Sequence, residues 1–245
     1  MGWNFRMLDE GIGFLEMPDW ALYNTKWHWK AYLNDVFRQL IAAKATALVI
    51  DLRANEGGSD VGDEIVAHLT TRPAKRQAVE RRVRYRKTPE DLNPFLDTWD
   101  DSFRDWGQAA LDLDARFFRL RRDADDDPAA PIAPKAPRFT GRVYALIGAT
   151  NSSATFEFAQ TLRQNGLGTL VGQTTGGNQR GINGGAFFFL RLPKSGLEID
   201  LPLIGQFPEG TRPDVGLEPD VRVVATLDDI AKGRDAEVEA VKRLI

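Results

Sequence analysis

The chain has 245 residues, 42% of them hydrophobic, which is enough to bury one sizeable core or two small ones. The 32 basic and 35 acidic residues leave a net charge of -3, so no strong field attracts nucleic acid or an anionic membrane. With no cysteine and only two histidines, His28 and His68, disulfides, thiolate nucleophiles and three-histidine zinc sites are excluded. We therefore expect no metal and no cofactor. No stretch approaches the roughly 18 consecutive apolar residues of a membrane span.

The first third of the sequence alternates between strand and helix patterns. Residues 11–20, GIGFLEMPDW, predict a strand that Pro18 stops. Apolar residues then recur every three or four positions from Trp27 to Ala43, as in an amphipathic helix. The apolar run ATALVID at 45–51 predicts a buried strand. A glycine turn, LRANEGGSD, and a helix over Val61–Leu69 follow it.

Residues 72–138 have a different character and predict an insertion or lid within one domain that spans 1–245. Aromatic residues are spread over 92–120, where we expect helices that cover an apolar surface. The proline-rich and aspartate-rich stretch RRDADDDPAAPIAPKAP that follows cannot sustain a helix and predicts a loop.

The strand, turn and helix pattern returns after this insertion. GRVYALIGA at 141–149 predicts a strand, TNSSATFEFAQTLRQNG a turn and helix, and TLVG at 169–172 the next strand. Two further strands are predicted at 186–192 and 197–201, and an amphipathic helix at 227–244.

Ser153 lies directly after a predicted buried strand and at the start of a predicted helix. A side chain at this place sits at the positive end of the helix dipole, beside backbone N–H groups that can receive developing negative charge. Such a serine can act as a nucleophile. The alternative is that Ser152 or Ser153 only caps the helix, and this position alone favours the cap.

Two glycine-rich turns follow predicted strands in the same way. Asn55-Glu56-Gly57-Gly58 allows close approach of the main chain and can point N–H groups at a ligand, although a plain turn is the more common outcome. The second turn runs from Gly172 to Gly181. Because the carboxyl ends of parallel strands meet at one edge, both turns and the start of the Ser153 helix can form a single site.

Together these stretches resemble the S41 peptidases, the family of tail-specific proteases, tricorn protease and interphotoreceptor retinoid-binding protein repeats. The resemblance begins near residue 11 and continues to the end of the chain. It rests on three ordered motifs: ALVIDLRANEGG, NSSATFEFAQTLRQNGLGTLVGQTTGG, and VGLEPDVRV with GRDAEVEAV.

The resemblance implies a fold, a nucleophile and a substrate class. The fold is an α/β crotonase/ClpP-like ββα spiral. Ser153 takes the nucleophile position, and the N–H groups of Ala154 and of Gly57 or Gly58 take the oxyanion-hole positions. The implied substrate is a peptide or protein, and the implied location is extracytoplasmic in a bacterium, with the export signal absent from this chain.

The general base is where the sequence departs from the family. Asn178 stands where processing proteases have a lysine, and Glu16 stands where tricorn-type members have a histidine. The tricorn glutamate falls on Pro213 or Asp214. Without a base, a serine hydroxyl is a poor nucleophile near neutral pH.

Three answers to this gap are open. Glu16 acts as the base if apolar neighbours raise its pKa, His28 acts instead, or the base is lost. For His28, a place on the helix surface or packing between Trp27 and Trp29 is favoured slightly over catalysis, and His68 is predicted to be structural. Asn178, Gln179 and Arg180 are expected to bind substrate carbonyls or a terminal carboxylate.

The sequence therefore supports two functions of different class. The first is a serine endopeptidase, favoured by the retained Ser-Ala pair and the glycine turn. The second is a catalytically inactive domain that binds a peptide or a hydrophobic ligand on the same scaffold, favoured by the missing lysine.

Overall fold

The computed structural model describes residues 2–8, 11–121 and 130–245, which form two compact units. The first unit consists of Met1–Gln77, Ala130–Asn178 and Asp214–Ile245, and the second of Ala78–Ala129 and Gln179–Pro213. Most of the predicted insertion thus combines with a later segment of the chain. Its role as a lid stays a prediction.

The first unit is built on a six-stranded sheet in the order β1-β2-β3-β8-β9-β12. Its strands are β1 (Asn4–Leu8), β2 (Ile12–Glu16), β3 (Ala47–Asp51), β8 (Arg142–Ile147), β9 (Thr169–Gly172) and β12 (Val221–Arg222). Only β1, which the sequence analysis does not predict, runs antiparallel to its neighbour β2. The carboxyl ends of β2, β3, β8 and β9 consequently lie at one edge of the sheet.

The described residues of this unit form the α-helices α1 (Trp29–Ala42), α2 (Val61–Leu69), α3 (Ser153–Asn165), α4 (Leu227–Ala231) and α5 (Ala236–Leu244). The helices predicted after the first strand, after the first glycine turn and at Ser153 are confirmed. The single C-terminal helix predicted over 227–244 is wrong. Gly233 adopts a left-handed φ of 62° just after α4, and Asp235 caps α5 by accepting a hydrogen bond from the N–H of Val238, so the chain forms two helices.

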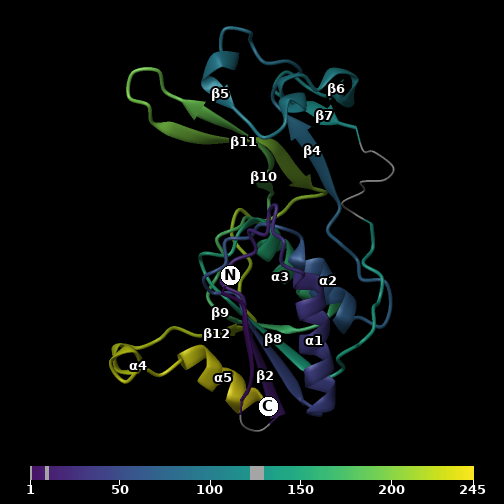
Figure 1. Ribbon diagram of the computed structural model, residues 1–245, viewed down its shortest axis with the longest axis vertical. Coiled ribbons are helices and arrows are strands. Elements are labelled where there is room, and N and C mark those ends of the chain that lie inside the picture. The colour runs from purple at the N-terminus through teal and green to yellow at the C-terminus, as the bar shows by residue number, and fades with distance from the viewer. Residues whose placement is uncertain (1, 9–10, 122–129) are drawn as a thin grey trace. The chain divides into compact units, whose positions relative to one another are not determined.

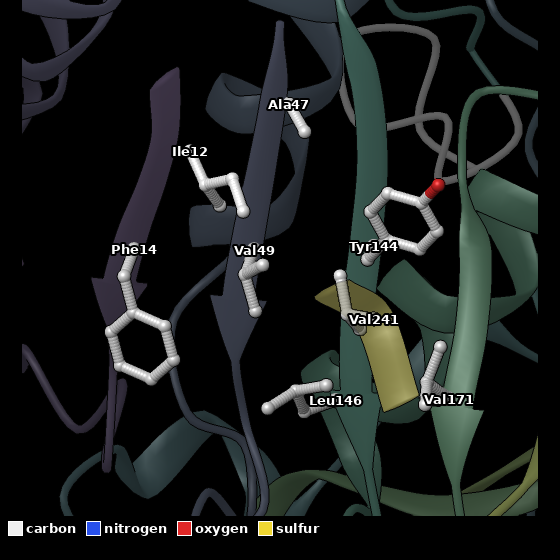
Figure 2. Packing of buried hydrophobic residues seen from close by; sticks show 8 residues of the cluster. All are labelled: Ile12, Phe14, Ala47, Val49, Tyr144, Leu146, Val171 and Val241. Atoms are coloured by element: carbon white, nitrogen blue, oxygen red, sulfur yellow. The ribbon is translucent and has the colours of Figure 1, made fainter. Parts of the chain in front are cut away.

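One face of this sheet forms a buried core with α5 (Figure 2). The residues of this core are Ile12 and Phe14 from β2, Ala47 and Val49 from β3, Tyr144 and Leu146 from β8, Val171 from β9, and Val241 from α5. Side chains alternate along a strand, so the intervening residues face the other way. There Gly13 lies against Leu40 of α1, where an added Cβ would be 2.3 Å from a Leu40 methyl carbon.

The second unit is an antiparallel sheet in the order β5-β10-β11-β4-β7-β6 (strands labelled in Figure 1). Its strands are β4 (Val79–Val83), β5 (Leu96–Asp97), β6 (Ala110–Asp112), β7 (Phe118–Leu120), β10 (Ile182–Arg191) and β11 (Glu198–Pro208). The two predicted strands near 186–192 and 197–201 are confirmed and are longer than expected. Val83, Ala110, Leu120, Ala186 and Ile204 form this unit's own core.

The helices expected within 92–120 are wrong. This stretch contains three short 3₁₀ segments, Asn93–Phe95, Asp101–Arg104 and Gly107–Ala109, between the strands β5, β6 and β7. Aromatic residues of this stretch pack against the sheet instead. The ring centroid of Trp99 lies 5.9 Å from that of Phe187 and 5.8 Å from that of Phe189. Tertiary packing thus overrides the local spacing. In the described part of the chain, no helix has the length and apolar character needed to cross a membrane.

Candidate active site

Ser153 begins α3 with an unusual backbone conformation. Its φ is 45°, in the left-handed region that non-glycine residues rarely adopt, whereas Ser152 before it is extended with a φ of -138°. The side chain of Ser153 is exposed, although Ala154, Thr155 and Phe156 after it are buried. Such strained residues cluster at functional sites, where the surrounding structure holds them in place.

The two adjacent serines have different surroundings. The hydroxyl of Ser152 donates a hydrogen bond of 2.8 Å to the backbone carbonyl of Glu56 and so ties the helix start to the first glycine turn. The hydroxyl of Ser153 has no hydrogen-bond partner among the described residues. Ser152 is therefore occupied in holding the structure, whereas the Ser153 hydroxyl is available.

The first glycine turn packs directly against Ser153. Gly57 has a φ of 118°, and an added Cβ there would lie 2.9 Å from the Cβ of Ser153 and 2.9 Å from the carbonyl oxygen of Ser152. Only glycine fits this place. The N–H of Gly57 donates to the side-chain oxygen of Asn55 at 2.9 Å, whereas the N–H of Gly58 has no acceptor among the described residues.

Two fully buried asparagines hold this arrangement, and the sequence analysis gives neither of them a role. The Nδ2 of Asn55 donates to the carbonyl of Met17 at 2.7 Å. The Nδ2 of Asn151 donates to the carbonyls of Leu52 at 2.6 Å and Asn55 at 2.9 Å, and its Oδ1 accepts from the N–H of Gly148. These bonds connect the ends of β2, β3 and β8. The only sequence signal is an asparagine next to a glycine turn or to the serine pair.

The second glycine turn reaches the same helix start. An added Cβ at Gly177 would lie 2.4 Å from the ring of Phe156, and the N–H of Gly177 donates to the carbonyl of Asn151 at 2.9 Å. The convergence of the two turns and the start of the Ser153 helix is confirmed. At the end of this turn, the Nδ2 of Asn178 donates to Oδ1 of Asp214 at 2.7 Å.

Among the described residues, neither Glu16 nor His28 forms a hydrogen bond with Ser153. Glu16 ends β2 on the sheet face of Phe14, is 47% exposed, and lies 4.0 Å from Arg6. The apolar burial expected for Glu16 is therefore wrong. His28 is exposed and precedes α1. Gln179 and Arg180 belong to the second unit.

His68 has a structural environment, as predicted. It is fully buried on α2, its ring stacks on Phe37 at 4.4 Å, and its Nδ1 lies 2.6 Å from the carbonyl of Pro137. Burial lowers the pKa of His68, although the carbonyl of Pro137 and the carboxylate of Glu64 act in the opposite direction. A buried, neutral imidazole that packs against a ring is part of the core.

The Asp-Leu-Arg of the first motif serves to hold α5. The guanidinium of Arg53 donates to Asp51 at 2.6 Å, to Asp235 at 2.7 Å and to Glu237 at 3.1 Å. Burial alone would raise the pKa of Asp235, but its hydrogen bonds from Arg53 and from the backbone lower it. The first and third motifs of the sequence thus meet in one ion-pair network.

A second carboxylate cluster lies between α2 and α3. Burial, together with the negative charges of Asp60 and Asp63, raises the pKa of Glu157 to about 7 against the opposing effect of Arg76. Burial also raises the pKa of Asp63, which forms an ion pair with Arg76, to about 6. In the described ranges, no group of three or more histidine, aspartate or glutamate side chains is arranged to hold a metal ion.

A scan against protein-family models matches residues 11–223 to Peptidase family S41. The chain belongs to this family. S41 members are serine peptidases, which agrees with the resemblance that the sequence motifs indicate. A search of curated proteins gives no match.

Solved structures share the fold of this S41 chain at low sequence identity. Mature CPAF in complex with lactacystin has a TM-score of 0.61 and 18% identity over 99% of this chain and 53% of its own. A candidate peptidase of Parabacteroides merdae ATCC 43184 has a TM-score of 0.58 and 20% identity over 99% of this chain and 64% of its own. Tricorn protease has a TM-score of 0.50 and 19% identity over 96% of this chain and 17% of its own. The chain thus spans less than two thirds of the length of these proteins.

Proposed function

We propose that this S41 chain is a serine-type peptidase and that Ser153 is its nucleophile. One observation carries the proposal: an exposed serine with a left-handed φ starts α3 while the backbone of Gly57 packs against its Cβ. This leaves the Ser153 hydroxyl at a helix N-terminus, in a place where no neighbouring side chain of the glycine turn covers it.

The oxyanion hole in this proposal uses the N–H groups of Gly58 and Ala154. Both have no acceptor among the described residues, and Ala154 is the second residue of α3, where helix N–H groups lack intrahelical partners. Gly57 is the weaker of the two glycine candidates because Asn55 already accepts its N–H. Two such donors stabilise the negative oxygen that forms on attack.

The proposed reaction proceeds in two steps. The Ser153 oxygen attacks the peptide carbonyl carbon and loses its proton to a base, the C–N bond breaks, and the amine leaves with that proton. Water then attacks the acyl-serine ester, and the acid product and the free hydroxyl are restored. The substrate class, a peptide or a protein, is part of the proposal.

For the base we propose Glu16, which holds the family position of the tricorn histidine at the carboxyl end of β2. Its ion pair with Arg6 at 4.0 Å must open for its carboxylate to accept the proton. His28 and Asp214 are the competing groups, and Asp214 is already paired with Asn178. Asn178, Gln179 and Arg180 are proposed to bind substrate. Comparing kcat/KM of Glu16→Gln, His28→Ala and Asp214→Asn from pH 5 to 9 identifies the base as the group whose loss removes activity.

The second function, a catalytically inactive peptide- or hydrophobic-ligand-binding domain, is favoured by one observation. No base lies within hydrogen-bonding distance of the Ser153 hydroxyl in the described part of the structure. Catalysis needs such a base, whereas binding does not.

Hydrolysis of a mixed peptide library, followed by mass spectrometry, separates the two functions. We expect new peptides with the wild type and with Ser152→Ala, and none with Ser153→Ala. Cleavage by Ser153→Ala at the wild-type rate would refute the nucleophile. A wild type that binds library peptides without cleaving them would favour the inactive domain.

The first unit is further proposed to be a crotonase/ClpP-like ββα spiral, which the repeated strand-turn-helix units β3-α2 and β8-α3 support. The extracytoplasmic location is likewise a proposal and is supported by the family resemblance alone. Fractionation of the native host cells tests it.

A further inference from the structure

The second unit contains a cavity of about 680 Å³ that the peptidase site does not use. It lies where β4 begins and β11 and β7 end. Four arginines and two glutamates line it, together with apolar side chains: Arg81, Arg82, Arg119, Arg121, Glu80, Glu209, Leu111, Leu120, Phe207 and Pro208. The lining therefore has an excess of two positive charges. Its volume is that of a ligand pocket and exceeds the size of a bare ion.

Two of these arginines lie directly opposite each other. Arg82 of β4 pairs in register with Arg119 of β7, and like charges that face each other across two strands destabilise a sheet. Glu80 is the one carboxylate that they share, 2.6 Å from Nε of Arg82 and 3.7 Å from Nη1 of Arg119. One negative charge thus serves two guanidinium groups.

The donors of Arg82 are mostly unused although the side chain is only 28% exposed. Its Nε donates to Glu80, and neither of its Nη atoms has an acceptor among the described residues. These donors are open to a second carboxylate, which can accept two parallel hydrogen bonds from one guanidinium.

The apolar part of the cavity favours a peptide over a nucleic acid. The guanidinium of Arg82 covers the ring of Phe207 at 4.4 Å, so this ring is not free to stack on a base. Leu111, Pro208 and the rest of the Phe207 ring still offer apolar surface beside the arginines. Acidic side chains, with short apolar stems and planar carboxylates, match this mixture.

We propose that this cavity is a binding site for peptide carboxylates, and that Arg82 and Arg119 hold an acidic segment of a polypeptide. The site does not involve Ser153, so the proposal stands whether or not the chain hydrolyses peptides. The carboxylates in this proposal come from a separate polypeptide.

Fluorescence anisotropy with a labelled six-residue peptide of alternating alanine and glutamate tests this site, and the matched alanine-glutamine peptide is the ligand control. We expect the double variant Arg82→Gln/Arg119→Gln to bind the alanine-glutamate peptide at least tenfold more weakly than the wild type. The control is the double variant Arg222→Gln/Arg243→Gln, which changes two exposed arginines of the first unit and should alter the affinity for the peptide less than twofold. Mass spectrometry at the end of each titration checks that the peptide is intact.

Glu80→Gln separates recognition from a folding defect. Glu80 competes for the same guanidinium groups, so its removal should tighten binding of the acidic peptide at least threefold, whereas a misfolded variant would bind more weakly. Weaker binding by Glu80→Gln, or unchanged binding by the double arginine variant, would overturn the proposal. So would competition by inorganic phosphate or by a single-stranded oligonucleotide at lower concentrations than the peptide.

Discussion

At the scale of single residues, Gly57 sets the geometry of the proposed nucleophile. A methyl group there would meet the Cβ of Ser153 and the carbonyl of Ser152, both at 2.9 Å, and would displace the helix start. Gly233 also has a positive φ, of 62°, but nothing lies within 4 Å of an added Cβ.

We therefore predict that Gly57→Ala lowers the rate of peptide hydrolysis at least 100-fold, because the oxyanion donors and Ser153 lose their alignment. Gly233→Ala, which also places alanine at a positive φ but causes no collision, should keep the wild-type rate. Steady-state kinetics on the same peptide check both. Equal rates for the two variants would show that the contact with Gly57 does not position Ser153.

Glu157 gives a prediction about pH. Its pKa of about 7 in the folded chain lies above the value of about 4.3 in an unfolded chain, so the folded state binds the proton more tightly. The contribution of Glu157 to the free energy of unfolding is thus fully present below pH 4.3 and is lost as the pH rises to about 7. Asp63 acts with the same sign up to about pH 6.

Glu157→Gln should flatten this pH dependence. The difference in free energy of unfolding between the variant and the wild type should favour the variant more at pH 8 than at pH 4.5. Urea unfolding at both pH values measures it. The exposed Glu90, changed to glutamine, is the control and should leave the wild-type profile unaltered. A stability difference between Glu157→Gln and the wild type that is the same at both pH values would contradict the assignment.

At the scale of elements, α5 is held to the sheet by the bonds of Arg53 to Asp51, Asp235 and Glu237. Arg53 is 29% exposed and Glu237 is 10% exposed, so removal of the arginine leaves carboxylates without a cation in a partly desolvated place.

Arg53→Met should lower the free energy of unfolding by about 3 kcal/mol and increase hydrogen exchange in α5. Arg222→Met is the matched control. It breaks only the exposed pair with Glu218 and should cost less than about 0.5 kcal/mol. Unchanged exchange in α5 of Arg53→Met would show that the apolar contacts of Val241 hold the helix without the ion pairs.

The elements of the Ser153 site could be predicted because their signals are local. Buried strands, glycine turns and the serine at a helix start each occupy adjacent positions in the sequence. The two buried asparagines could not be assigned, since the bond from Asn151 to Leu52 joins residues 99 positions apart. Within 92–120, β5 and β7 were missed because their partners, β10 and β4, lie elsewhere in the chain. The strand β6 pairs with β7 inside the same stretch, but each of the two has only three residues, too few for a clear alternating pattern.

At the scale of the whole molecule, each unit has a core of its own. Leu146 belongs to the core of the first unit and Ile204 to that of the second. Length and composition predict a single domain. They could not predict two separate cores, because the second unit is assembled from two segments that lie far apart in the sequence.

We predict two unfolding transitions in calorimetry, one for each core. Leu146→Ala should lower the midpoint of one transition and Ile204→Ala that of the other, each by the loss of about 2–5 kcal/mol that a cavity in a core produces. A single transition that both substitutions shift together would show that the two cores unfold as one.

The central claim, that Ser153 is an activated nucleophile, is tested most directly by mapping the adduct of a serine-reactive fluorophosphonate by peptide mass spectrometry. We predict one adduct, on Ser153, in the wild type and in Ser152→Ala, and none in Ser153→Ala. An adduct on Ser152, Ser59 or Ser195, or labelling that persists in Ser153→Ala, would contradict it.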